Sequence, residues 1–172
     1  MKQPYKARLN QEVSPLRLAG IPIATVVLGS MTTILPFVTS APLLPPFGLL
    51  VLIAWMMLRP GLWPVWAGVP FGLVDDVFSG QPIGSAVLLW SVILIAMDII
   101  EQRYVWRNHW QDWLIAAAFI IFALLAGLAI NNSLTAHNAT IITILPQLII
   151  SLAIFPLVLR LVARLDRLRL KR

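Results

Sequence analysis

The sequence predicts an all-α membrane protein, a bundle of six transmembrane helices with both termini in the cytoplasm. Of its 172 residues, 59% are hydrophobic and 12% are charged, and the mean hydropathy is +0.87. Charged residues make up about a quarter of an ordinary soluble domain. This composition therefore places the chain in a lipid bilayer and leaves no room for a separate soluble domain.

The distribution of Lys and Arg predicts the orientation of the chain. Four precede the first apolar run, Arg59 follows the second, Arg103 and Arg107 follow the fourth, and six follow the last. Together they account for all 13 Lys and Arg residues. Because these residues concentrate in cytoplasmic loops, the pattern predicts six spans with both ends inside. The net charge of +6 accompanies no nucleic-acid-binding motif.

The chain divides into a polar cytoplasmic segment, residues 1–18, a transmembrane domain, residues 19–159, and a basic cytoplasmic tail, residues 160–172. The first apolar run is long enough to cross a hydrocarbon core of about 30 Å. A cleaved signal peptide is the alternative for this run, but the apolar stretch is too long for one. The six predicted spans are 19–39, 43–58, 62–78, 83–100, 113–130 and 139–159.

Two of these spans are short, and the last one leads into the tail. Spans 43–58 and 62–78 either cross the bilayer fully or form a re-entrant pair, because the Arg59-Pro60-Gly61 break alone fixes the turn between them. The tail is expected to be an amphipathic helix that leaves the membrane and lies along its inner surface. A specific partner site is the alternative to this role as a lipid anchor. Its cationic stripe consists of Arg160, Arg164, Arg167 and Lys171.

The third span carries the candidate site, because it places Asp75 and Asp76 in an otherwise apolar run. A charged side chain at the bilayer centre costs roughly 2.5 to 3.5 kcal/mol on insertion scales, so it needs a partner or a purpose. Small or polar residues recur near one helical stripe of this span and in the turn after it. This face is either a packing seam within the bundle, a seam for another protein or the wall of a cavity. Its members are Gly68, Gly72, Asp76, Ser79, Gly80 and Gly84.

Helical geometry separates the two carboxylates, since adjacent residues point about 100° apart. Asp76 shares the glycine face, so we expect it to be the buried one. Gln147 and Ser151, four residues apart in the sixth span, are expected by default to have a packing role, and hydrogen bonds to Asp76 are the alternative. Catalysis by paired carboxylates needs two groups that converge on one water, which adjacent helical residues cannot do. We therefore predict no enzymatic activity.

No metal or cofactor is expected. The chain has no Cys, and His109 and His137 fall in loops on opposite sides of the predicted bundle. The two imidazoles therefore cannot share a metal ion.

The motif residues also resemble a known family. The segment from Pro46 to Trp55, the Arg59-Pro60 pair, the pattern D-x-x-S-G-x-x-x-G from Asp76 to Gly84 and a basic-aromatic loop after the next span are similar to MreD, the rod shape-determining membrane protein family. Asp75 and the long polar N-terminus depart from the family pattern.

The resemblance implies a non-enzymatic scaffold in the bacterial inner membrane, part of the cell-elongation machinery. Its implied partner is a single-span MreC-like protein and, through it, cytoplasmic MreB and the peptidoglycan synthases outside. Membrane lipids are further partners, and a homodimer within the complex stays open. The resemblance also implies a fold similar to the substrate-binding subunits of energy-coupling-factor (ECF) transporters. The alternative function is therefore that of a small-molecule-binding transport subunit.

Overall fold

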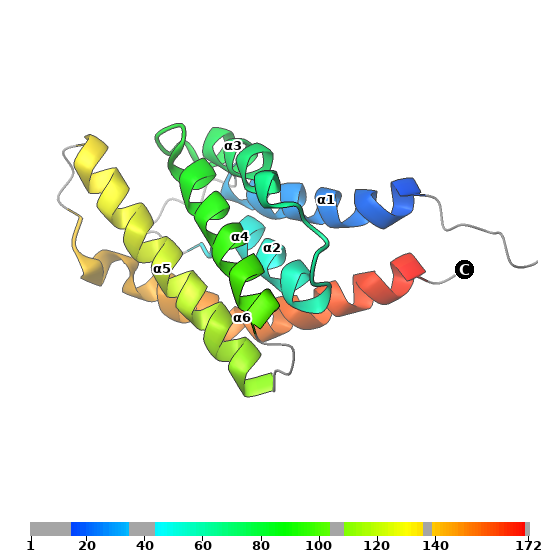
Figure 1. Ribbon diagram of the computed structural model, residues 1–172. Coiled ribbons are helices and arrows are strands. Elements are labelled where there is room, and N and C mark those ends of the chain that lie inside the picture. Colours follow the sequence, from blue (N-terminus) through cyan, green and yellow to red (C-terminus); the bar gives the residue numbers. More distant parts are fainter. Residues whose placement is uncertain (1–14, 35–43, 104–108, 136–138, 171–172) are drawn as a thin grey trace, which may run out of the picture.

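The computed structural model describes residues 15–34, 44–103, 109–135 and 139–170, and within these ranges it contains helices and no strand. Six α-helices and two short 3-10 helices follow one another along the chain (Figure 1). Their bounds are α1 Pro15–Met31, η1 Thr32–Ile34, α2 Phe47–Leu58, η2 Val65–Ala67, α3 Gly68–Ser79, α4 Ser85–Arg103, α5 His109–Thr135 and α6 Ile141–Leu170.

Six helices correspond in order to the six predicted spans, but they differ in length. Helices α4, α5 and α6 are long and apolar enough to cross a membrane. Helices α1 and α2 are apolar but shorter. The 12 residues of α3 extend about 18 Å, less than a typical hydrocarbon core. The crossing of all six helices and the cytoplasmic placement of the termini therefore stay predictions.

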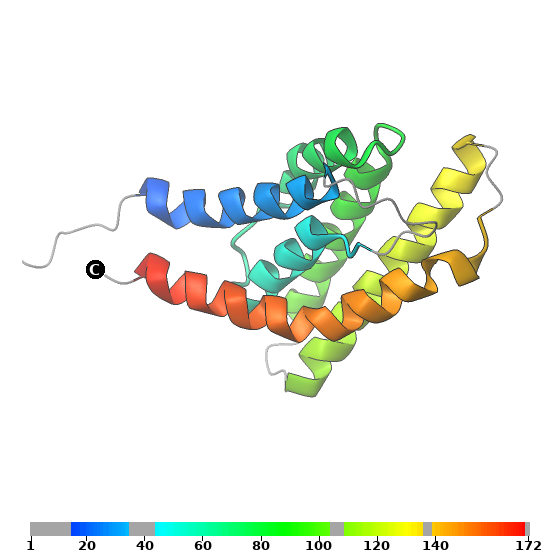
Figure 2. The ribbon, with the colours of Figure 1, turned by 180° about the vertical axis from the view of Figure 1, so that it is seen from behind.

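Helix α2 forms the centre of the bundle. Nine of its 12 residues are buried, as expected for a helix that is apolar on every side. It packs against α1 and α6 (Figures 1 and 2). Near its end, the Trp55 indole is fully buried and donates a hydrogen bond from Nε1 to Thr25 Oγ1 of α1 at 2.9 Å. The polar atom of this large ring is thereby satisfied inside the core.

The tail is the last part of α6, and its position at a membrane surface stays a prediction. Residues 160–170 do not leave the bundle as a separate surface helix, because α6 continues without a break to Leu170. Its inward side chains Val158 and Val162 belong to the hydrophobic core. The start of α1 and the end of α6 lie on the same side of the molecule (Figure 2). Of the predicted cationic stripe, Arg160, Arg164 and Arg167 are exposed, whereas Lys171 lies outside the described residues.

An ionic cluster joins the end of α2 to the tail. Arg59 donates from Nε and Nη2 to Asp166 Oδ2 at 3.0 and 2.9 Å. Asp166 also pairs through Oδ1 with Arg169 at 3.3 Å. The Arg169 guanidinium lies 5.3 Å from the Trp55 ring centroid, within the range of a cation–π interaction. The tail is thus held by the protein itself, a role that the charge pattern did not predict.

This cluster generates a stability prediction. Asp166→Ala should lower the free energy of unfolding by roughly 3 kcal/mol, because buried Arg169 would lose its ion pair with Asp166. Arg59→Ala should cost less, since its side chain is 42% exposed. Unfolding in detergent measures both variants, with exposed Arg164→Ala as a control that should stay close to wild type. An equal loss for Arg59→Ala and Asp166→Ala would contradict this ranking.

Candidate functional site

The glycine face of α3 is packed against α4 of the same chain. A Cβ atom at Gly68 would lie 2.7 Å from the Ser91 backbone, and one at Gly72 would lie 2.5 Å from Val87 Cα. Real Cβ atoms do not approach backbone this closely, so only glycine permits the contact. Of the alternatives that the sequence left open, the structure shows the packing seam within the bundle. A partner cannot reach this face while α4 occupies it.

Asp76 lies at the end of this seam and is only 1% exposed. Its Oδ2 accepts the Gly84 N–H at 2.7 Å. Its Oδ1 accepts the Ala86 N–H at 2.8 Å and the Ser85 hydroxyl at 2.9 Å. Because α4 begins at Ser85, the carboxylate satisfies N–H groups that have no partner within their own helix. It also lies at the positive end of the α4 dipole.

The turn between α3 and α4, residues 80–84, depends on the glycine at each of its ends. Gly80 ends α3 in the left-handed region with φ +65°, and Gly84 has φ +102° just before α4. Side chains other than glycine rarely adopt such φ values. The N–H of Ser85, the first residue of α4, also bonds to Pro82 O in the turn at 3.1 Å. A positive-φ glycine thus lies at each end of the turn. The Asp76 carboxylate also holds the end at Gly84.

Ser79, the remaining member of the predicted motif, does not join this network. Its hydroxyl is buried and has no hydrogen-bond partner among the described residues.

Gln147 and Ser151, the candidate partners on α6, bond elsewhere in the described structure. Gln147 Nε2 donates to Leu44 O, just before α2, at 2.7 Å. The Ser151 hydroxyl donates to Gln147 O at 2.6 Å within α6. Two of the three hydrogen bonds to Asp76 come from backbone N–H groups instead. Every residue except proline has such a group, so the sequence does not indicate which ones bind the carboxylate.

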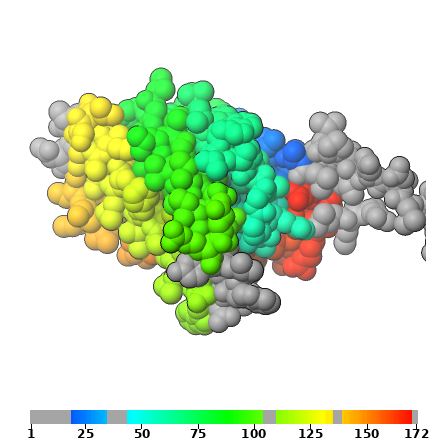
Figure 3. Space-filling model, viewed as in Figure 1, coloured from blue at the N-terminus to red at the C-terminus, as the bar shows by residue number. Residues whose placement is uncertain are grey.

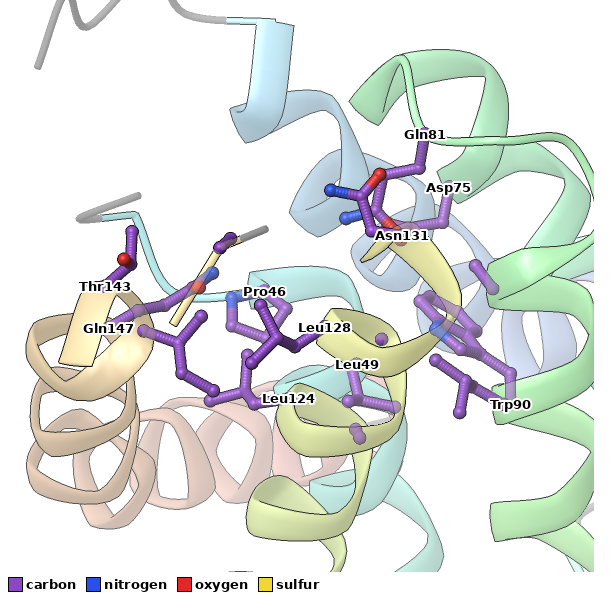
Figure 4. A pocket seen from close by; sticks show the side chains of 16 residues that line it. Pro46, Leu49, Asp75, Gln81, Trp90, Leu124, Leu128, Asn131, Thr143 and Gln147 are labelled. Atoms are coloured by element: carbon purple, nitrogen blue, oxygen red, sulfur yellow. The ribbon is translucent and has the colours of Figure 1, made fainter. Parts of the chain in front are cut away.

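The Asp75 side chain lies in different surroundings from that of Asp76. It lies beside Ser30 of α1 and lines an open cleft of about 310 Å³ that also contacts α2, α4, α5 and α6. We call this cavity the outer cleft, because it lies at the end of the bundle that the charge pattern predicts to face outside. Asp75, Gln81 and Asn131 gather at one side of it, and Thr143 and Gln147 lie at the other (Figure 4).

The geometry separates the chemical roles of the two carboxylates. Both Asp76 oxygens accept hydrogen bonds from the start of α4, whereas Asp75 borders the cleft. They do not converge on one water, as paired catalytic carboxylates must. In the described parts of the chain, no group of three His, Cys, Asp or Glu side chains is placed to hold a metal ion.

The comparisons with known proteins give one match. Residues 18–166 match the family model described as rod shape-determining protein MreD. Those residues include all of α2 to α5, the α3–α4 turn and most of α6. No curated protein and no solved structure matches the chain. The expected likeness in fold to ECF substrate-binding subunits therefore stays a prediction.

The cap generates a second prediction. Asp76→Asn should lower the free energy of unfolding by about 1 to 2 kcal/mol, because an amide nitrogen would face one of the N–H donors. Asp76→Leu should cost more, since it leaves all three donors buried without an acceptor. Asp75→Asn is the matched control and should unfold like wild type. Similar losses at both positions in chemical unfolding would argue against a specific cap.

The glycine seam between α3 and α4 leads to a third prediction. Gly72→Ala should destabilise the protein by roughly 1 to 3 kcal/mol, because the added methyl group pushes α4 away from α3. Gly20→Ala in α1 is the control, since a Cβ there meets nothing within 4 Å. Thermal unfolding in detergent should show a loss for the first variant and none for the second. A wild-type unfolding temperature for Gly72→Ala would show that the seam is looser than described.

Proposed function

The chain belongs to the MreD family of rod shape-determining proteins, and from this we propose that it is a non-enzymatic membrane scaffold of the bacterial elongation machinery. Family membership supports a membrane protein with a role in rod-shape determination. The proposed partner is a single-span MreC-like protein in the inner membrane. Through that partner the scaffold would help couple cytoplasmic MreB to the peptidoglycan synthases outside.

The observation that supports a docking surface is an apolar stripe on the side of α3 away from α4. Val69, Leu73 and Val77 are 50%, 47% and 64% exposed and follow one another at intervals of four residues. The stripe leads toward Ile83 in the turn, which at 81% is the most exposed large apolar side chain among the described residues. Helix α3 lies at the edge of the bundle (Figures 1 and 3). We call this surface the outward α3 face.

The cap on α4 makes this face suitable for a protein partner. Asp76 and the two positive-φ glycines hold the turn that carries Ile83. A preorganised surface loses little conformational entropy when a partner binds. Helices in membranes associate by close packing rather than by a hydrophobic driving force, so a rigid stripe favours one partner geometry over lipid. We propose that the transmembrane helix of the partner lies along this stripe, with its juxtamembrane region over Ile83.

The opposite end of the bundle supports the cytoplasmic part of the proposal. Arg160, Arg164 and Arg167 are exposed on α6, while Asp166 and Arg169 anchor that helix to α2. The exposed cations are therefore carried on a fixed helix. We propose that they contact anionic lipid headgroups and face the cytoplasmic partners.

Co-purification tests the docking surface. Leu73→Trp and Val77→Trp should each reduce recovery of the MreC-like partner roughly tenfold, because a bulky ring on the stripe prevents close helix packing. Leu125→Trp is the matched control, since Leu125 is a 40% exposed side chain on α5. It should retain the partner.

Unfolding temperatures must stay at the wild-type value in all three variants for the comparison to hold. Full recovery of the partner with both α3 variants would overturn the proposed surface. Loss with the α5 variant alone would place the contact on α5.

A further inference from the structure

The outer cleft has an unbalanced charge. Asp75 lines it, whereas none of its lining residues is Lys or Arg. The sequence has no Lys or Arg between Arg17 and Arg59, between Arg59 and Arg103, or between Arg107 and Arg160. A carboxylate in partly apolar surroundings is costly unless a charge or several donors compensate it. The Arg residues of the helices that form the cleft, Arg103 in α4 and Arg160 to Arg169 in α6, are not among the residues that line it.

The volume and the lining of the cleft also suit a small ligand. Its volume of about 310 Å³ lies at the lower end of the range for small-molecule sites, roughly 300 to 1,000 Å³. Gln81 and Asn131 flank Asp75, and the side chains of Leu49, Leu124 and Leu128 form an apolar stretch beyond them (Figure 4). This arrangement fits a ligand with a polar head and an apolar stem.

Gly127 supports this interpretation. It lies in the middle of α5 and lines the cleft. A Cβ there would meet only Leu89 Cδ1, at 3.7 Å, an ordinary van der Waals contact. Packing therefore does not require glycine, although glycine inside a helix costs about 1 kcal/mol relative to alanine. Its effect is to leave room in the cleft.

We propose that the outer cleft binds an organic cation, an ammonium or guanidinium group on a short apolar stem. The head pairs with the Asp75 carboxylate in a charge-assisted hydrogen bond, and the amide oxygens of Gln81 and Asn131 accept its remaining N–H groups. The stem lies along Leu124 and Leu128. The cation is either a free small molecule or a Lys or Arg side chain of a bound protein. The chemistry at Asp75 is the same for both sources.

A pair of probes tests the charge requirement. Nα-acetyl-lysine amide and Nα-acetyl-norleucine amide have nearly the same shape, but only the first is cationic. The lysine probe should raise the unfolding temperature of the detergent-purified protein in a saturable way, at ionic strength matched with NaCl. The norleucine probe should not.

Two variants locate the effect. Asp75→Asn should weaken binding of the lysine probe at least tenfold. Gly127→Leu, which fills the cleft, should abolish the response. If Gly127→Leu does not fold, Asp75→Asn alone decides the result. The proposal is overturned by no response to the lysine probe, by an equal response to norleucine or NaCl, or by an undiminished response in Asp75→Asn.

A separate measurement identifies the source of the cation. Asp75→Asn that loses the probe but still co-purifies with the MreC-like partner indicates a free organic cation. Parallel loss of probe and partner indicates a basic side chain of that partner. Leu73→Trp lies on the other side of α3 and should leave probe binding unchanged. Failure of the docking surface and failure of the cation site are therefore distinguishable.

Discussion

The carboxylate of Asp76 is the constraint on which the arrangement of α3 and α4 depends. It accepts two backbone N–H groups and one hydroxyl at the start of α4, although it belongs to the preceding helix. Buried backbone N–H groups must find partners inside the protein, because an unpaired buried group is costly. A tight turn between two packed helices therefore persists only if its buried N–H groups are satisfied. Asp76 provides this, and the glycine seam then brings the two helices into direct contact.

Once α4 covers the glycine face, the remaining sides of α3 become available for other roles. The outward α3 face presents Val69, Leu73 and Val77 to the surroundings. The side that carries Asp75 borders the outer cleft instead. One short helix thus separates a surface suited to a partner helix from a cavity suited to a small polar group. Both depend on the position of the turn, so the cap influences each of them without contacting a ligand.

Local patterns in the sequence predicted much of this site. The four-residue spacing of Gly68, Gly72 and Asp76 predicted a shared face, and the 100° between adjacent residues predicted different surroundings for Asp75. The hydrogen-bond partners of Asp76 were not predicted, because Gly84 and Ala86 contribute backbone groups that no side-chain pattern marks. The pairing of Arg59 with Asp166 was also missed, since the residues are 107 positions apart. The lipid-anchor prediction for the tail did not include the buried Asp166 and Val162.

Amide hydrogen exchange of the Asp76→Asn protein tests the central claim most directly, because the substitution changes almost no volume. We expect faster exchange at Gly84 and Ala86, with the amides of α6 exchanging as in the wild type. Such a result would show that the carboxylate itself protects the first amides of α4. Unchanged exchange at Gly84 and Ala86, or equally faster exchange throughout the bundle, would contradict the assignment of Asp76 as the cap of α4.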